Sequence, residues 1–499
     1  MKQRPNIVVI ISDCLRARNL PCYGYKKPTA PRLTELATDG LCYENAISSA
    51  EQTLTSTSAL FTGAYPATHG LFVTGDTLNP SLKTVAQALS ETGYDTHCIN
   101  CNNPYVTDFT GLDRGFDHVT IAFPWLRRKW FDLRKRRMSH VRDANVPSPA
   151  LPEPAAAFSP ASNPASGKRL RWLMTRMFDG GAKKAFAEAR RALSPAGDRP
   201  AFVYVHLMET HMYYHPPSHH ANMFLPDTKG REPWSVNQNP ISYLSGDTPM
   251  DDLDFEIVEG LYNGAIHYTD ELFGRFLDWM KKTGQLDNTI VVFTADHGES
   301  FGEHGLLGHG QCVYDTVVHV PMLVWGPVVS AESRGSTVRQ VVQNIDLTGS
   351  LLEWAGCDDE TMAKQMQGKP LPVSAGAPRT RDAALSFTVE AFEREHIALK
   401  QELGLLHKAA VGARSDTHKF IWNATDPDEL YDLQADPGET TNLLGTLPEV
   451  EQELRSHVDG ILPTFERSRE ATLERLRGGD TGGCHPMVEE RLRDLGYIE

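Results

Sequence analysis

The chain has 499 residues, and its 64 acidic against 49 basic side chains give a formal net charge of −15 at pH 7. This length suggests roughly two to four domains. The negative charge argues against a nucleic-acid partner. The absence of any run of about 18 apolar residues argues against a transmembrane segment.

The first predicted element is a strand over Asn6–Ser12, an apolar and largely β-branched run that ends next to Asp13. The basic start before it resembles a secretion signal, but the apolar run extends only from Ile7 to Ile11 and no small-residue cleavage site follows. The eight cysteines are scattered, as expected in a reducing cytoplasm rather than in a disulfide scaffold. We therefore expect a cytoplasmic protein.

The segment Gln52–Gly63 is polar and then apolar, which predicts a loop that enters a helix near Thr53–Ser58. The first N–H groups of a helix lack intrahelical partners and form the positive end of its dipole, so a hydroxyl there could help to hold an anion. Threonine is also an ordinary N-cap. Both interpretations of Thr53 stay open at this point.

The next predicted strand, Asp95–Asn100, carries or adjoins the CxxC pair Cys98 and Cys101, which we interpret as two small buried residues at a strand end. An insertion is predicted around residues 125–198, where the basic segment Trp125–Arg142 precedes a stretch rich in Pro, Ala and Ser. The basic segment could contact an anionic substrate or a membrane surface, or form a solvated flap.

A further buried strand is predicted over Ala201–Met208, with His206 inside it and His211 just beyond it. The apolar stripe of Phe255–Lys281 predicts a long helix, which leads to another buried strand, Thr289–Thr294.

That strand is followed by Asp296 and His297 and then by a glycine-rich loop that carries His309. In open α/β sheets, ligands bind beyond the carboxyl ends of the strands. Asp13 and Asp296 are therefore expected on one rim of one sheet. Acids and an imidazole in that position predict a metal site with an anion pocket beside it.

The character of the sequence changes beyond about residue 375. Lys408–Gly412 and His418–Asn423 predict a hairpin, and a charged helical tail begins at Leu447. We therefore predict a catalytic α/β domain over residues 1–375, which includes the insertion, and a smaller α+β subdomain over residues 376–499.

Several long segments resemble, in the same order, those of the sulfatase branch of the alkaline phosphatase superfamily. They are NIVVIISDCLRARNLPCYGY, TLTSTSALFTGAYPATHG, FVYVHLMETHMYYHPP, YTDELFGRFLDWMKKTGQLDNTIVVFTADHGE, GHGQCVYDTVVHVPMLVWG, ELYDLQADPGETTNLL and EERLRDLGYIE. The resemblance runs nearly end to end. It implies an alkaline phosphatase-like α/β fold, in which helices flank a large mixed, mostly parallel sheet and a smaller C-terminal subdomain follows.

The resemblance also implies a metal site and a nucleophile. Asp13, Asp296 and His297 match metal ligands of the family, and Thr53 falls where the family has its nucleophile, which also contacts the metal. The implied cofactor is one divalent ion: manganese, zinc, magnesium or calcium. A carboxylate, hydroxyl and imidazole donor set suits the first three better than an all-oxygen calcium cage.

Two further histidines match substrate-binding residues of the family. His211 matches the histidine that contacts the ester and protonates the leaving oxygen, and His309 matches a cationic residue that binds a non-bridging oxygen of the substrate.

The sequence departs from the family where most sulfatases carry CxPxR, the motif whose Cys is oxidised to formylglycine. Here Thr53–Thr57 reads TLTST, and threonine cannot become formylglycine, so none is expected. Cys14 stands at the second Asp of the usual acid pair. This replacement favours one metal ion over two, unless Asn19, Glu299 or His304 supplies a ligand.

We therefore predict a metal-dependent hydrolase of sulfate or phosphate mono- or diesters, with Thr53 as the metal-activated nucleophile. Its partner would be a small-molecule or glycan ester, and a homo-oligomer is compatible with this function. One alternative is a transferase that passes a phosphoryl-linked group between lipid or sugar head groups and binds membrane through Arg127–Arg142. The other is an inactive binding protein that kept the fold after losing CxPxR.

Overall fold

The computed structural model describes residues 4–73, 75–101, 105–122, 180–194, 199–388 and 409–477. The basic segment Trp125–Arg142 and the Pro-rich stretch after it lie outside these ranges. Of the predicted insertion around residues 125–198, the structure describes only residues 180–194, so its proposed extent stays a prediction.

The main sheet has eight strands in the order β11-β2-β10-β7-β1-β6-β4-β5. β10 runs against its neighbours β7 and β2, and every other pairing in the sheet is parallel. The sheet is therefore mixed and mostly parallel, as predicted. The strands are β1 (Asn6–Ser12), β2 (Leu41–Tyr43), β4 (Asp95–Asn100), β5 (His118–Ile121), β6 (Ala201–Leu207), β7 (Thr289–Thr294), β10 (Met322–Trp325) and β11 (Ser336–Val338).

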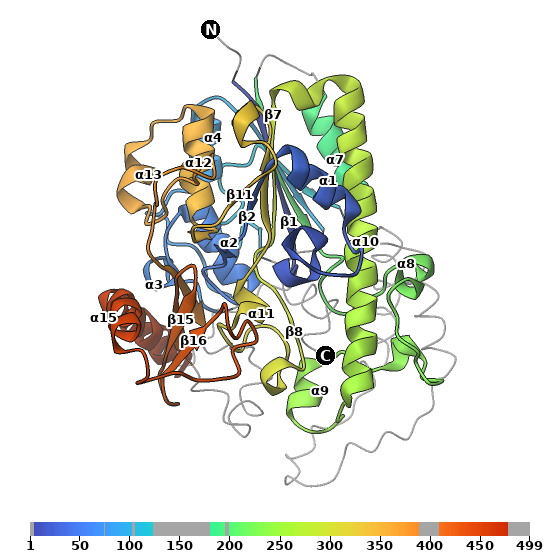
Figure 1. Ribbon diagram of the computed structural model, residues 1–499. Coiled ribbons are helices and arrows are strands. Elements are labelled where there is room, and N and C mark those ends of the chain that lie inside the picture. The colour runs from blue at the N-terminus through green and yellow to red at the C-terminus, as the bar shows by residue number, and fades with distance from the viewer. Residues whose placement is uncertain are drawn as a thin grey trace, which may run out of the picture.

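Helices cover both faces of this sheet (Figure 1). Side chains alternate along β1, so Val8 and Ile10 enter the core beneath one helical layer and Val9 enters the core beneath the other. One layer contains α1 (Pro31–Asp39), α7 (Ala182–Leu193) and α10 (Asp252–Thr283); the other contains α2 (Thr53–Thr62), α4 (Val85–Glu91) and α12 (Asp346–Ala355). Shorter elements are α3 (Pro66–His69), α8 (Ser218–Asn222), α9 (Pro240–Leu244), α11 (Asp315–Val318), α13 (Glu360–Gln365), β3 (Ala46–Ile47), β8 (Ser300–Phe301), β9 (Leu307–Gly308) and β12 (Val342–Gln343).

The predicted long helix is α10, which starts three residues before the predicted Phe255. A capping box holds its start: Asp251 accepts from the backbone N–H of Asp254, whose side chain accepts from the backbone N–H of Asp251. Gly284, in the left-handed region at φ 72°, ends it.

A second, four-stranded antiparallel sheet forms the smaller C-terminal unit. Its order is β13-β14-β15-β16, and the predicted hairpin is the β14–β15 pair. α15 packs on the sheet through Leu454, Val458 and Phe465 (Figure 1). The elements are β13 (Ala384–Thr388), β14 (Ala410–Arg414), β15 (His418–Asn423), β16 (Glu429–Asp432) and α15 (Pro448–Arg477). Among the described residues, no helix is both long enough and apolar enough to cross a membrane.

Candidate active site at the carboxyl edge of the main sheet

The side chains predicted to form a metal site lie together at the carboxyl edge of the sheet. Asp13 follows β1, and Asp296 and His297 follow β7, the strand beside β1. Thr53 is the first residue of α2, whose N-cap is Gln52, so the N-cap interpretation of Thr53 is wrong. All four side chains are buried. The sheet order thus joins three segments that are far apart in the sequence.

Four contacts among these side chains have the spacing expected of ligands of one ion. Thr53 Oγ1 lies 3.1 Å from His297 Nε2 and 3.4 Å from Asp13 Oδ2. His297 Nε2 lies 3.6 Å from Asp296 Oδ2 and 3.7 Å from Asp13 Oδ1. Two ligand atoms bound at about 2.1 Å in a tetrahedral arrangement are about 3.4 Å apart.

The hydrogen bonds of the cluster leave room for a cation. Asp296 Oδ1 accepts from the backbone N–H groups of His297 at 3.0 Å and Cys14 at 3.4 Å. Asp296 Oδ2 is buried and accepts no hydrogen bond from any residue in the described part of the chain. A buried carboxylate oxygen without a partner is costly, and a cation would remove that cost. His297 Nδ1 donates to Gly298 O at 2.9 Å, which leaves the Nε2 lone pair facing the cluster. The donor set therefore fits a divalent metal.

Gly298 lets the chain after β7 pass close to α11. A Cβ at this position would lie 2.4 Å from Thr316 O, nearer than real Cβ atoms come to backbone oxygen. The backbone N–H groups of Gly298 and Glu299 donate to Val317 O at 2.6 Å and Thr316 O at 3.0 Å. These backbone hydrogen bonds to α11 fix the position of the chain at His297 and Glu299.

The structure adds His206, on β6, to the site. Its Nε2 donates to Asp13 Oδ2 at 2.9 Å, and its Nδ1 lies 2.9 Å from the hydroxyl of Tyr204. Burial lowers the pKa of His206, but the Asp13 carboxylate outweighs it and the pKa is raised. For Asp13, burial acts in the opposite direction and raises the pKa. The hydrogen bond from His206 and the nearby imidazoles outweigh burial and hold the pKa of Asp13 well below its usual range. Asp13 is therefore a carboxylate at neutral pH.

The sequence places His206 in a strand but assigns it no role at the site. The sequence feature that could have pointed to His206 is its position at the end of a buried strand, where an ionisable side chain needs a partner. Its partner could not be named, because it depends on β6 lying beside β1.

Beside the candidate metal ligands, the imidazole of His309 lies close to His297. His309 Nδ1 lies 2.9 Å from Glu299 Oε1, and Tyr214 donates its hydroxyl to Glu299 Oε2 at 2.6 Å. Burial lowers the pKa of His309, but the Glu299 carboxylate raises it by more than burial lowers it. The pKa of His309 is therefore raised overall. The His309 ring centroid is 4.4 Å from that of His297. The raised pKa of His309 favours a positive charge next to the candidate metal site, as its predicted role requires.

His211 lies on the same side, with its ring centroid 5.3 Å from that of His309. Its Nδ1 donates to Met212 O at 2.6 Å. Burial and the neighbouring His309 lower the pKa of His211, despite the opposing effect of the Asp13 carboxylate. The resting imidazole is therefore neutral with its proton on Nδ1. A bound anion would raise its pKa and allow Nε2 to be protonated.

Cys14, at the position of the second family Asp, has a left-handed backbone with φ 60°. Its carbonyl accepts from the Tyr262 hydroxyl at 2.7 Å, and its Sγ lies 3.1 Å from Asp13 Oδ1. Burial, followed by the carboxylates of Glu299, Asp13 and Asp296, raises the pKa of the Cys14 thiol well above its usual value. Cys14 is accordingly a neutral thiol that donates to Asp13.

Two of the three residues suggested to fill the gap left by Cys14 point elsewhere. Asn19 donates to Glu259 Oε1 at 2.9 Å and Asn263 Oδ1 at 3.0 Å, both on α10. His304 stacks on Tyr314, with ring centroids 3.7 Å apart. Of the three, Glu299 lies beside the cluster, and it pairs with His309.

Comparisons with known proteins agree with this geometry. The family model described as "Sulfatase" matches residues 5–357, and the one described as "N-sulphoglucosamine sulphohydrolase, C-terminal" matches residues 302–462. The chain is 23% identical to an arylsulfatase of Clostridium perfringens over 96% of each chain. It is 22% identical to an N-acetylglucosamine-6-O-sulfatase of Bacteroides thetaiotaomicron over 89% of this chain and 83% of that protein.

Among solved structures, the phosphonate monoester hydrolase of Agrobacterium radiobacter superposes with a TM-score of 0.67 at 21% identity. The match covers 93% of this chain and 96% of that chain, so the two share the fold from end to end. With the family match over most of its length, the chain belongs to the sulfatase family of ester hydrolases, in the alkaline phosphatase superfamily.

Proposed function

We propose that the chain is a metal-dependent hydrolase of sulfate or phosphate esters that uses Thr53 as its nucleophile. The position of Thr53 carries the proposal: its hydroxyl lies against Asp13 and His297 at the start of α2. The unpaired N–H groups at the start of a helix favour an anion at that place.

Asp13, Thr53, Asp296 and His297 would hold the metal. When bound, a divalent ion lowers the pKa of a coordinated hydroxyl and offsets negative charge on the ester. Two carboxylates, one hydroxyl and one imidazole favour manganese, zinc or magnesium over calcium.

The protein's own residues then divide the reaction into two steps. Thr53 Oγ1 bonds to sulfur or phosphorus as the bond to the leaving oxygen breaks, and the Thr53 proton passes to solvent. His309, charged through Glu299, binds a non-bridging oxygen. His211, protonated once the anion is bound, supplies a proton to the leaving oxygen. Water then cleaves the sulfo- or phosphothreonine and restores the hydroxyl.

Sulfated or phosphorylated small molecules and glycans are the substrate class we propose. The similarity to an N-acetylglucosamine-6-O-sulfatase supports a sulfate ester, and the similarity to a phosphonate monoester hydrolase supports an ester of a phosphorus oxyanion. The transferase alternative depends on Arg127–Arg142, which lie outside the described residues. The binding-protein alternative is disfavoured, because a decayed site has no physical reason to keep buried carboxylates and imidazoles together.

A metal-reload assay tests the proposal. The protein is stripped, reloaded with manganese, zinc, magnesium or calcium, and assayed on nitrophenyl sulfate, phosphate, phosphodiester and phosphonate esters. Thr53→Ala should lower kcat/KM on the order of 10³-fold or more. Thr53→Ser should restore part of it, and mass spectrometry during its turnover should detect a peptide modified at the substituted position.

The matched control is Thr55→Ala on the same helix, because the Thr55 hydroxyl donates to Leu71 O, away from the site. If Thr53→Ala and Thr55→Ala lose equally little activity, Thr53 is not the nucleophile. A direct attack by water would then replace the covalent route.

A further inference from the structure

A second group of metal-ligating side chains lies where α8 packs on α10, away from the sheet edge (Figure 1). His219 and His220 are on α8, and Glu271 is on α10. One potential ligand atom from each of the three lies within 4.8 Å of the others. His267, one turn before Glu271 on α10, contacts the same group.

His220 is the centre of this group, and its ring is held at both nitrogens. Its Nε2 lies 3.3 Å from Glu271 Oε2, and its Nδ1 lies 2.7 Å from His267 Nδ1. Its side chain is 1% exposed. The ring centroid of His219 is 3.8 Å away. His220 is therefore fixed in place before any ligand arrives.

The contact with His267 couples the tautomers of the two rings. Two ring nitrogens 2.7 Å apart share one proton, so one imidazole donates and the other accepts. Without a cation, the Glu271 carboxylate favours a proton on His220 Nε2. When a cation replaces that proton, His220 can donate from Nδ1 to His267 Nδ1, and its Nε2 lone pair can bind the cation. A hydrogen bond at the far nitrogen is the arrangement that orients metal-bound histidines.

The backbone also brings the two helices close enough for side chains to share a ligand. Gly264 of α10 lies against α8, and a Cβ there would come within 2.8 Å of Ala221 Cα. The donors therefore stand on a preformed helix contact, and no chain closure is needed to assemble them.

We propose that His219, His220 and Glu271 form a zinc site, separate from the catalytic cluster, with His267 as the positioning residue. Two imidazole nitrogens and one carboxylate oxygen are typical zinc ligands, and water would complete a tetrahedral set. Glu271 also pairs with Arg275 through its other oxygen, so one carboxylate oxygen remains directed at His220.

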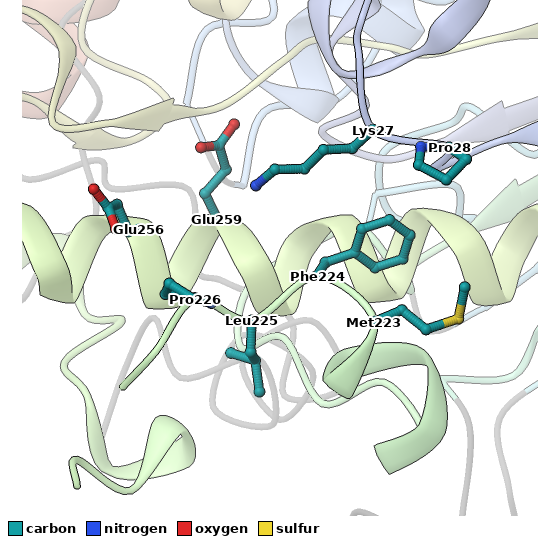
Figure 2. A pocket seen from close by; sticks show the side chains of 8 residues that line it. All are labelled: Lys27, Pro28, Met223, Phe224, Leu225, Pro226, Glu256 and Glu259. Atoms are coloured by element: carbon teal, nitrogen blue, oxygen red, sulfur yellow. The ribbon is translucent and has the colours of Figure 1, made fainter. Parts of the chain in front are cut away.

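The ion would fix one wall of a cavity of about 540 Å³ between α10 and the chain that follows α8. Met223, Phe224 and Leu225 border that cavity opposite Lys27 (Figure 2). Phe224 links the two features, because its ring centroid is 5.7 Å from that of His267. Zinc would thus hold α8 on α10 and stiffen residues 223–226.

The test uses the full chain in an Asp296→Ala background, which removes the catalytic site from the zinc count. After stripping, calorimetric titration with Zn²⁺ alone should give one ion per chain. Hydrogen exchange at residues 221–226 should slow when Zn²⁺ is added. In this background, His267→Ala should weaken binding by about 10- to 100-fold, as expected for a residue that orients a ligand.

Because His220 is buried and its removal could prevent folding, the exposed His219 and the half-buried Glu271 provide the ligand variants. His219→Ala and Glu271→Gln should each abolish stoichiometric zinc binding, whereas His457→Ala on α15 should leave it intact. No zinc bound in the Asp296→Ala background overturns the proposal. So does zinc binding that survives both ligand variants.

Discussion

Two buried clusters of charged side chains differ in how their charges are balanced. At the junction of the two sheets, Lys419 Nζ lies 2.8 Å from both Asp315 Oδ1 and Glu439 Oε1, and Arg414 Nε lies 3.0 Å from Asp315 Oδ2. Two cations thus meet two acids. At the carboxyl edge of the main sheet, Asp296 Oδ2 accepts no hydrogen bond within the part of the chain that the structure describes.

The difference separates a cluster whose charges are paired within the protein from the candidate metal site. Buried charges persist when they are paired and hydrogen-bonded, so the junction needs nothing more to be stable. A buried carboxylate oxygen without a hydrogen bond is costly, and a cation bound beside it would remove that cost. The unbalanced cluster therefore marks the candidate metal site, although both clusters contain the same kinds of residue.

The largest expected effect comes from removing the surplus charge. Asp296→Asn should abolish metal binding and turnover, while the melting temperature of the metal-free protein should stay the same or rise because a buried carboxylate oxygen without a hydrogen bond is gone. Metal analysis, the ester assay and a thermal melt check this. The matched variant Asp315→Asn in the balanced cluster should lower the melting temperature. Equal destabilisation by both variants would remove the distinction between the clusters.

A smaller effect is expected for His211→Ala, which tests whether anion binding turns a neutral imidazole into an acid. The loss should be about 10²-fold or more for alkyl esters, which need a protonated leaving oxygen. It should be much smaller for nitrophenyl esters, whose leaving group is stable as an anion. Steady-state kinetics on the two ester series give the ratio, and equal losses would count against an acid role.

The junction predicts a change in stability without a change in chemistry. Lys419→Met removes the cation that pairs with both Asp315 and Glu439. It should lower the free energy of unfolding by about 3–5 kcal/mol, because two buried carboxylates lose a partner. Activity per folded, metal-loaded molecule should be kept. Urea titration measures the first quantity, with Lys364→Ala as the control, because its exposed pair with Glu360 contributes about 1 kcal/mol or less. A small loss in Lys419→Met would show that the junction is not held by its ion pairs.

The smallest effect concerns a buried group that carries no charge. His69 Nδ1 accepts from Leu71 N at 3.1 Å, and burial lowers the pKa of His69 to about 3. Since the unfolded chain binds the proton near pH 6.5, the stability contribution is present above that pH and declines as the pH falls. Between pH 7 and pH 5 the loss from this group is about 2 kcal/mol.

His69→Gln should remove that part of the pH dependence in chemical denaturation at the two pH values, whereas His457→Gln should not. A pH dependence that is unchanged in His69→Gln would mean that the folded protein accepts the proton on His69 at little cost.

The sequence alone determined the local parts of this protein. Apolar runs predicted β1, β6 and β7 because their residues fit a sheet buried on both faces, and the acids after β1 and β7 predicted the edge where Asp13 and Asp296 meet. The helix signals located α10 to within three residues at each end. The resemblance of the motifs to the sulfatase family also assigned roles to Thr53, His211, His297 and His309, and these roles stay predictions.

Only the tertiary structure decided which charged or polar side chains contact each other. His206 contacts Asp13 because β6 lies beside β1, and Lys419 contacts Asp315 because the second sheet lies against α11. His220 meets Glu271 through the packing of α8 on α10. None of these contacts leaves a periodic pattern in the sequence, since each joins segments about 50 to 190 residues apart whose proximity depends on strand order and helix packing.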